Sequence, residues 1–568
     1  MKQLLRSFFA QRSWVNLTRS LSFGVISSAI AALPATAADR ITMFFGPLQF
    51  SLSVDSLELY ARQGKVNDEL AFYTKRANPQ QVGQLRSWLQ QRASVSPVLI
   101  SQITYTRLGE AILQQAGTIV QTDAGQNGFY ALRAAFLLAA ADPQGVTVVN
   151  VLRHYPSPSV RLDLKAGLAL VRTFTMGMQQ QQQVIAAVQQ IAIAEATAQP
   201  SIDFAQRPKL QQPGSVRWRR QTFQLTEQAR TVPVDLYLPE RNAGDKTSIP
   251  LIVLLHGAAS DRNTFAYLAI HLASHGFAVA VPESPGNSAQ RYRQFLAGRA
   301  TEPDVAELVN QPLDVKRLLD ALEHRSRTDT ALQALNLQQV GVMGHSQGGY
   351  AALALAGAPL NVAQLQQDCQ SERSFNLALL VQCQALTLPP TAESLQDSRI
   401  KAVLAVNPIT SSLLGRVSLS QIQVPTMLVA GSDDAVTPAV LEQIRPFTWL
   451  TTPNRYLVLI THGTHFSVLG GAPDDSGVLK IPSSLAGSDP SIARGYLSAL
   501  SLAFFETHVA QQTTYRQYLS GAYARYLSQE PLPLSLLQSG KGLEAVSGQP
   551  LELFSRCLKA LDRRLIAP

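Results

Sequence analysis

The segment Gly344-His345-Ser346-Gln347-Gly348 has the residue types and the spacing of a serine nucleophile turn. It lies between an apolar stretch that predicts a buried strand, 339–343, and one that predicts a helix, 349–356. A Gly-x-Ser-x-Gly turn holds its serine in a strained strand-to-helix corner, and the small glycines let the helix pack closely while the hydroxyl stays exposed. The chemistry expected here is nucleophilic attack by Ser346.

Carboxylates and imidazoles follow this serine in the order that a catalytic triad on such a fold requires. Asp433-Asp434 follows the apolar stretch 426–430, and both His462 and His465 follow the stretch 456–460. A serine hydroxyl needs an imidazole to accept its proton, and the imidazole needs a carboxylate to fix its tautomer. Because loops at the carboxyl ends of parallel strands open on one side of a sheet, these groups can converge. Spacing alone leaves both aspartates and both histidines open.

A further apolar run, 251–255, ends in His256-Gly257-Ala258 and predicts the strand that carries part of an oxyanion hole. In this architecture one oxyanion amide comes from the residue after the nucleophile, here Gln347, and the second comes from the loop after this strand, here Ala258. His256 is expected to brace that loop and His345 to pack beneath the serine turn. Neither histidine is the expected base.

Together these motifs resemble the α/β-hydrolase superfamily. The residues that carry the resemblance are His256-Gly257, Gly344 to Gly348, Gly431-Ser432-Asp433-Asp434 and Thr464-His465-Phe466-Ser467. More narrowly, the chain resembles bacterial predicted hydrolases related to platelet-activating-factor acetylhydrolases and dienelactone hydrolases. In those proteins an N-terminal domain of unassigned function precedes the hydrolase, and the similarity covers nearly all of the chain after residue 38.

The resemblance implies roles for single residues. The family pattern of a glycine, two residues and an aspartate selects Asp434 as the acid, and that of a histidine before an aromatic residue selects His465 as the base. Dienelactone hydrolases use a cysteine nucleophile, whereas position 346 is serine. This departure favours a serine esterase or lipase.

The predicted function is therefore that of a serine hydrolase that cleaves carboxylic esters, of lipids or of short acyl groups, through an acyl-enzyme. The mechanism requires no cofactor and no metal. Its partner is a small-molecule ester or lipid substrate, with transient contact to a membrane surface as an open alternative; the sequence identifies no protein partner. A polyester or lactone hydrolase, and a non-catalytic binding protein that keeps the hydrolase fold, remain as alternatives.

Composition excludes several classes of protein. The chain has 568 residues, 46% of them hydrophobic, which suffices for more than one globular core. Its formal charge of +9 depends partly on four cations that precede the first acidic residue, Asp39. Without these, 44 of the 48 lysines and arginines remain against 39 acidic residues, with no long basic run. We therefore expect no nucleic-acid binding.

The first 38 residues predict a signal peptide, with a basic start, an apolar stretch over 21–33 and cleavage after Ala37. An uncleaved anchor is the alternative, but this stretch falls short of the roughly 20 apolar residues that a span needs. The protein is thus expected in the periplasm or outside the cell. Cys369 and Cys383 lie close together in one insertion and predict a disulfide, with reduced thiols as the alternative, and Cys557 is left over.

Two domains are expected after the signal. Residues 39–213 predict a mainly helical domain of unknown role, with a strand-like opening over 41–54 and helices over segments such as 82–90 and 159–171. Its glutamine-rich tail, 179–190, predicts a helix with a solvated polar face, and an interaction tract is the alternative.

Residues 214–568 predict the α/β-hydrolase fold, a mostly parallel central sheet with helices on both faces. Two antiparallel strands, 216–225 and 232–238, open this sheet. The parallel strands expected after them are 251–255, 277–281, 340–343, 402–406, 426–430 and 456–460. The insertion 359–399, with an apolar helix over 375–386, is a candidate lid over the acyl pocket, and a packed structural excursion is the alternative.

Overall fold

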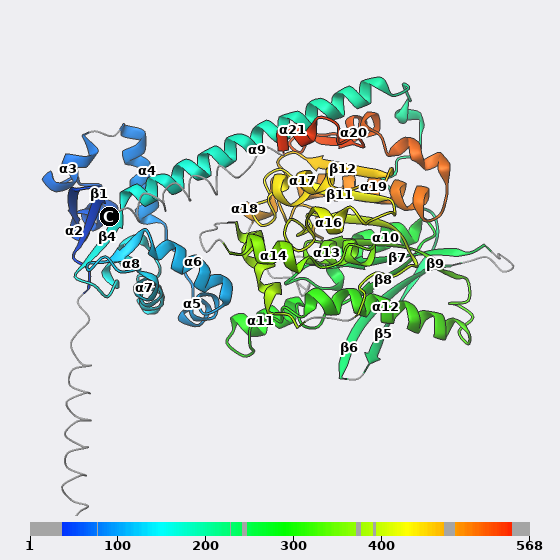
Figure 1. Cartoon of the computed structure of the whole chain (residues 1–568), viewed down its shortest axis with the longest axis horizontal. Coiled ribbons are helices and arrows are strands. Elements are labelled where there is room, and N and C mark those ends of the chain that lie inside the picture. Colours follow the sequence, from blue (N-terminus) through cyan, green and yellow to red (C-terminus); the bar gives the residue numbers. More distant parts are fainter. Residues whose placement is uncertain are drawn as a thin grey trace, which may run out of the picture. The chain divides into compact units, whose positions relative to one another are not determined.

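The computed structural model describes residues 37–75, 78–227, 229–240, 247–370, 376–389, 393–470 and 483–547. Apart from its last two residues, the predicted signal peptide lies outside the described residues, as does Cys557. The chain divides into two compact units (Figure 1). The first holds Met1–Ile100 with Ala116–Gly167, and the second holds Ser101–Gln115 with Leu168–Pro568.

The first unit is built on a small sheet as well as on helices. β1 (Arg40–Phe45) and β2 (Leu48–Ser53) form a hairpin, β4 (Ser159–Asp163) pairs parallel with β1, and β3 (Val120–Thr122) completes the order β2-β1-β4-β3. The helices that precede β4 in the sequence are α2 (Val54–Gln63), α3 (Asp68–Thr74), α4 (Pro79–Gln90), α5 (Pro97–Thr104), α6 (Arg107–Gly117), α7 (Phe129–Ala141) and α8 (Val148–Arg153). Of these, the second half of α5 and most of α6 belong to the second unit.

The helix predicted over 159–171 is wrong in its first five residues. These five residues form β4, which pairs in parallel with β1 and leaves Val160 fully buried. The helix, α9, begins only at Leu164 and continues without a break to Ala198 (Figure 1). Its residues from Leu168 onward belong to the second unit.

The glutamine-rich tract is helical, as predicted, and lies within α9. Val184, Val188, Ala192 and Ala196 are buried at intervals of four residues, so one stripe of the helix packs against protein. Among the described residues no helix, α9 included, combines the length and the apolar composition needed to cross a membrane.

The second unit contains a nine-stranded sheet with the order β13-β12-β11-β10-β9-β7-β8-β6-β5. The six strands from β12 to β8 pair in parallel. At the two ends of the sheet, β13 pairs antiparallel with β12, and β6 pairs antiparallel with both β8 and β5. This confirms the predicted α/β-hydrolase fold. The strands are β5 (Trp218–Glu227), β6 (Arg230–Pro239), β7 (Ile249–Leu255), β8 (Ala278–Pro282), β9 (Leu335–His345), β10 (Ile400–Val406), β11 (Thr426–Gly431), β12 (Arg455–Ile460) and β13 (Leu534–Leu537).

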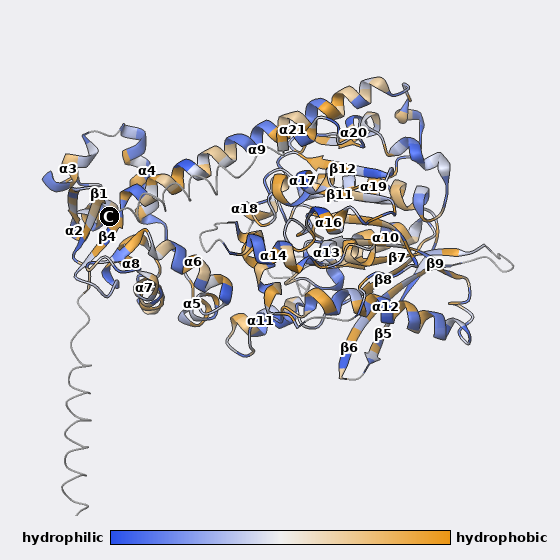
Figure 2. Cartoon of the chain, viewed as in Figure 1, coloured by the Kyte–Doolittle hydropathy of each residue, from blue (hydrophilic) through white to orange (hydrophobic). Residues whose placement is uncertain are grey.

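Apolar residues fill both faces of this sheet. Its strands are therefore continuous apolar runs, which Figure 2 colours orange. Successive residues of β7 alternate between two clusters: Val253 lies in one, with residues of α9, α12 (Glu307–Ser326) and α13 (Gln347–Leu355), and Leu254 lies in the other, with residues of α10 (Ala266–Ser274) and α19 (Pro490–His508). The remaining α-helices are α11 (Ala289–Leu296), α14 (Val362–Asp368), α15 (Leu377–Cys383), α16 (Gly415–Leu419), α17 (Arg445–Phe447), α18 (Ser483–Ala486), α20 (Gly521–Leu527) and α21 (Leu543–Ser547).

The insertion after α13 contains α14 and α15, and a disulfide joins Cys369 to Cys383, as predicted. The fully buried Gln382 at the end of α15 accepts hydrogen bonds from the amides of Ser412 and Leu413, at 2.8 and 2.9 Å. Its own amide donates to the buried Glu442, at 3.0 Å. The end of α15 is thus anchored to the loop after β10.

Candidate active site

Ser346 occupies the corner between β9 and α13 with φ 55° and ψ −120°. A positive φ is rare for a residue with a side chain, so the surrounding turn holds the serine in a strained conformation. Its amide donates to Val406 O, at the end of the adjacent β10, over 2.9 Å. Local backbone geometry thus produces the strand-to-helix corner that the motif predicts, with Ser346 half-buried.

The glycines of this turn are required by close approaches of the backbone. A Cβ on Gly344 would lie 1.9 Å from Gly348 O, and one on Gly348 would lie 2.6 Å from Leu255 O. Gly257, in the loop after β7, approaches the serine itself, because a Cβ there would lie 2.9 Å from Ser346 Cβ. The turn and the loop after β7 therefore fit together only without these side chains.

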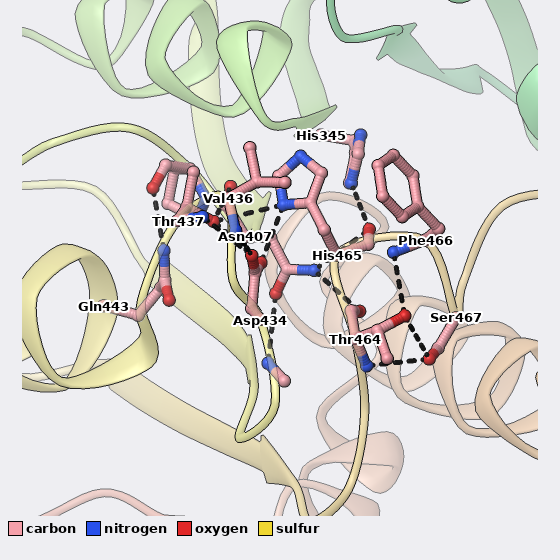
Figure 3. Close-up of polar contacts among 12 residues, drawn as sticks. His345, Asn407, Asp434, Val436, Thr437, Gln443, Thr464, His465, Phe466 and Ser467 are labelled. Atoms are coloured by element: carbon pink, nitrogen blue, oxygen red, sulfur yellow. Dashed lines mark hydrogen bonds and ion pairs between the residues drawn. The ribbon is translucent and has the colours of Figure 1, made fainter. Parts of the chain in front are cut away.

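His465 and Asp434 form a buried pair (Figure 3). His465 Nδ1 lies 2.7 Å from Asp434 Oδ2. The other carboxylate oxygen, Oδ1, accepts hydrogen bonds from the amides of Val436 and Thr437, at 2.8 and 2.7 Å. The Thr437 hydroxyl also donates to Asp434 Oδ2 over 2.8 Å. These donors fix the carboxylate where it can orient the imidazole.

The alternative pair, Asp433 and His462, lies at the surface. Its ring-to-carboxylate distance is 3.3 Å, and its side chains are 54% and 63% exposed, respectively. Asp433 also accepts a hydrogen bond from the Ser432 hydroxyl, at 2.7 Å. The structure therefore distinguishes the two candidate acids and the two candidate bases. Asp434 and His465 are buried together, whereas Asp433 and His462 pair at the surface.

His345 and Asn407 hold the backbone of the candidate base. His345 Nε2 donates to His465 O over 2.9 Å, and its ring lies 4.7 Å from that of His465 between centroids (Figure 3). Burial and, after it, the neighbouring His465 hold the pKa of His345 well below its usual range, so it remains a neutral donor. The Asn407 amide also donates to His465 O, at 3.3 Å, and accepts from Gly431 N at 3.1 Å.

The loop after β7 is braced by His256. Its Nε2 accepts a hydrogen bond from Ser284 N at 3.0 Å, so Nδ1 carries the proton and donates to Gly257 O at 2.8 Å. Burial lowers the pKa of His256, which keeps this neutral tautomer. Gln311 on α12 donates to His256 O over 2.9 Å. These contacts fix the peptide that precedes Ala258.

One of the two candidate oxyanion amides belongs to the serine turn, and the other belongs to the loop after β7. Ala258 is exposed, and Gln347 is the first residue of α13. Within the described part of the chain neither amide has a backbone acceptor, whereas the next amide, of Ala259, donates to Asn287 O at 2.9 Å. Both are therefore free to donate to a substrate oxygen.

Comparison with known proteins gives two family matches. Residues 250–385 match the alpha/beta hydrolase fold, and residues 37–163 match a family described as an alpha/beta hydrolase of unknown function. The chain belongs to the α/β-hydrolase superfamily. It is also 28% identical over 239 residues to RutD of Pseudomonas savastanoi pv. phaseolicola (strain 1448A / Race 6), which is provisionally named a carbamate hydrolase. That match covers 35% of this chain and 91% of the relative.

These comparisons support a hydrolase. The match over 250–385 contains Ser346 and both candidate oxyanion amides.

Several residues that support the candidate site are missing from the sequence-based prediction. Asn407 directly follows a predicted strand, a position where polar residues commonly face a site, so it could have been found. Thr437 and Gln311 gave no such signal, because their roles depend on contacts across the fold.

Proposed function

We propose that the protein is a serine hydrolase that cleaves carboxylic esters through an acyl-enzyme on Ser346. The observation that carries this proposal is the buried His465–Asp434 pair, on loops that follow β12 and β11 of the sheet whose strand β9 leads into the strained corner of Ser346. A buried carboxylate beside an imidazole serves a hydrolase directly, because the imidazole becomes charged during acyl transfer. A protein that only binds ligands has no use for the strained serine, so the arrangement favours catalysis over the binding-protein alternative.

The proposed reaction begins with attack of Ser346 Oγ on the carbonyl carbon of the ester. His465 accepts the hydroxyl proton at Nε2, because Nδ1 is engaged with Asp434. The amides of Ala258 and Gln347 stabilise the tetrahedral oxyanion. His465 then passes the proton to the leaving alcohol, and water, deprotonated by the same imidazole, hydrolyses the acyl-enzyme.

The substrate class is proposed from the insertion and the resemblance. Apolar residues of α15 lie in the insertion that follows the nucleophile helix, where an acyl chain can be covered, which supports lipid or short-acyl esters. A polyester or lactone would undergo the same attack. Carbamates are a second candidate, favoured by the similarity to the RutD protein, because their carbonyl carbon is attacked in the same way.

Export to the periplasm or the exterior is part of the proposal. The Cys369–Cys383 disulfide supports it, since such bonds persist in oxidising compartments. N-terminal sequencing of the protein recovered from the host would test cleavage after Ala37.

The substrate test uses the mature protein beside its Ser346→Ala variant. Both are assayed on p-nitrophenyl esters from acetyl to palmitoyl, on a matched p-nitrophenyl carbamate and on simple lactones. We expect serine-dependent turnover that is faster on one group of esters than on the carbamate. Faster serine-dependent turnover of the carbamate would replace the ester proposal with the second candidate, and an equal rate for the variant would overturn the role of Ser346.

A further inference from the structure

Two glutamines of α9 contact the loops that carry the proposed acid and base. Gln181 Nε2 donates to Ser432 O over 2.8 Å, and Gln189 Nε2 donates to Thr461 Oγ1 over 3.0 Å. Ser432 begins the loop of Asp434 after β11, and Thr461 begins the loop of His465 after β12. All of these residues belong to the second compact unit. The polar face of α9 was predicted to be solvated, but these two glutamines on it contact protein instead.

The helix that presents these glutamines is firmly attached to the hydrolase core. Val184 and Val188, between the two glutamines, are fully buried in the apolar cluster that also contains α13 residues of the nucleophile helix. Further along, the Glu195 carboxylate accepts hydrogen bonds from the amides of Gln538 and Ser539, both at 2.9 Å. This attachment keeps the side chains of Gln181 and Gln189 at fixed positions on the loops.

The two loops are also bonded to each other. Ser432 N donates to Ile460 O at 3.0 Å, and the Ser432 hydroxyl accepts from His462 N at 2.8 Å. Asp433 N donates to Gly463 O at 2.9 Å. The acid loop and the base loop are thus held to each other next to the buried carboxylate and imidazole that they carry.

We propose that Gln181 and Gln189 are positioning residues of the hydrolase, which hold the acid loop and the base loop together so that Asp434 and His465 stay within hydrogen-bonding distance. This inference rests on the proposed triad. Neither glutamine contacts the reacting atoms, and their effect is exerted through Ser432 and Thr461. A small misplacement of a catalytic group can lower turnover by about 10²-fold, so two distant hydrogen bonds can control the rate.

The glutamine tract supplies its own control variants. Gln181→Met with Gln189→Met removes both donors but keeps the side-chain length and the helix propensity. Gln183→Met with Gln190→Met makes the same change at two exposed positions of the same helix. Gln181→Lys restores a donor at one site in the first double variant.

Two readouts on the full chain test the proposal. We expect the first double variant to lose at least about 10-fold in kcat with KM within twofold, to recover partly with Gln181→Lys, and to keep its thermal transition. We also expect it to lose the far-downfield proton resonance of the His465 Nδ1–H, which the control pair retains. This resonance requires no turnover, so it separates failure of this inference from failure of the ester proposal.

Retention of the resonance and of kcat in the first double variant would overturn the inference. An equal effect of the control pair would overturn it as well. A fall in thermal stability together with a rise in KM would assign the glutamines to structural support alone, which also contradicts positioning.

Discussion

His465 Nδ1 lies 2.7 Å from Asp434 Oδ2, inside the protein, at a site where every oxygen of the carboxylate has a donor. The adjacent carboxylate, of Asp433, faces solvent and pairs with His462. Two neighbouring residues of one type thus have opposite environments, which makes their comparison informative.

Asp434→Asn should lower kcat by about 10³ to 10⁴-fold, because the amide no longer holds the imidazole in the tautomer that accepts the serine proton. Asp433→Asn should change kcat less than about threefold, since it removes only an exposed pair. Steady-state kinetics on one ester would compare the two variants. A larger loss for Asp433→Asn would exchange the roles assigned to them.

Gly344→Ala should destabilise the protein by about 3 kcal/mol or more, because the added Cβ meets the Gly348 carbonyl and the turn must open. Gly495→Ala is the matched control, since Gly495 lies in α19 with no atom within 4 Å of the added Cβ. That change should stabilise the helix by about 0.4 to 1 kcal/mol. Urea unfolding monitored by circular dichroism would measure both. Similar stabilities for the two variants would show that the turn tolerates a side chain.

Stability should fall between about pH 4.5 and pH 7 because of Glu506. Burial raises the pKa of this carboxyl from 4.5 to about 7, so the folded state binds a proton that the unfolded state has released. The stabilising effect is complete below pH 4.5 and is lost as the pH rises through 7, of the order of 3 kcal/mol in all.

Glu506→Gln should therefore raise the unfolding free energy at pH 8 and leave it nearly unchanged at pH 4. Glu544→Gln, an exposed change on α21, serves as the control. Denaturant titrations at both pH values would provide the comparison. Equal gains at pH 4 and pH 8 would contradict the role given to proton binding.

Replacing Cys369 and Cys383 with serine should lower the unfolding free energy by about 3 kcal/mol, as expected for a bond that closes a loop of 14 residues. The bond constrains the unfolded chain, and it joins the ends of α14 and α15. Cys557→Ser is the thiol control. Melting curves with and without reductant should differ for the wild type and coincide for the double variant; a reductant effect on the double variant would point to another cause.

Patterns local to the chain were sufficient to predict the strands of the large sheet except β13, which pairs antiparallel at its edge. Each parallel strand is a continuous apolar run because helices cover both faces, and such runs are recognisable without any tertiary information. The strand at Ser159–Asp163 was mistaken for helix because its five residues precede a long helical pattern directly. Its pairing with β1, more than a hundred residues earlier, decides the outcome, and no local pattern encodes it.

The candidate site likewise contains residues that a local sequence pattern predicts and residues that no local pattern predicts. Ser346 and its glycines are fixed by the local turn, so their motif predicts them. The choice between Asp433 and Asp434 depended on family resemblance, because both follow the same strand and only their burial distinguishes them. Gln181 looked like part of a low-complexity tract, and its contact with Ser432, 251 residues away, could not be read from its neighbours.

The most direct test of the central claim is labelling with a fluorophosphonate, which reacts with a serine that an adjacent base has activated. Wild type and Ser346→Ala would be treated and digested, and the modified peptide located by mass spectrometry. We predict one phosphonyl group per chain, on Ser346, absent from the Ser346→Ala variant and strongly slowed in His465→Ala. Labelling of another serine, or the same labelling rate in His465→Ala, would contradict the account.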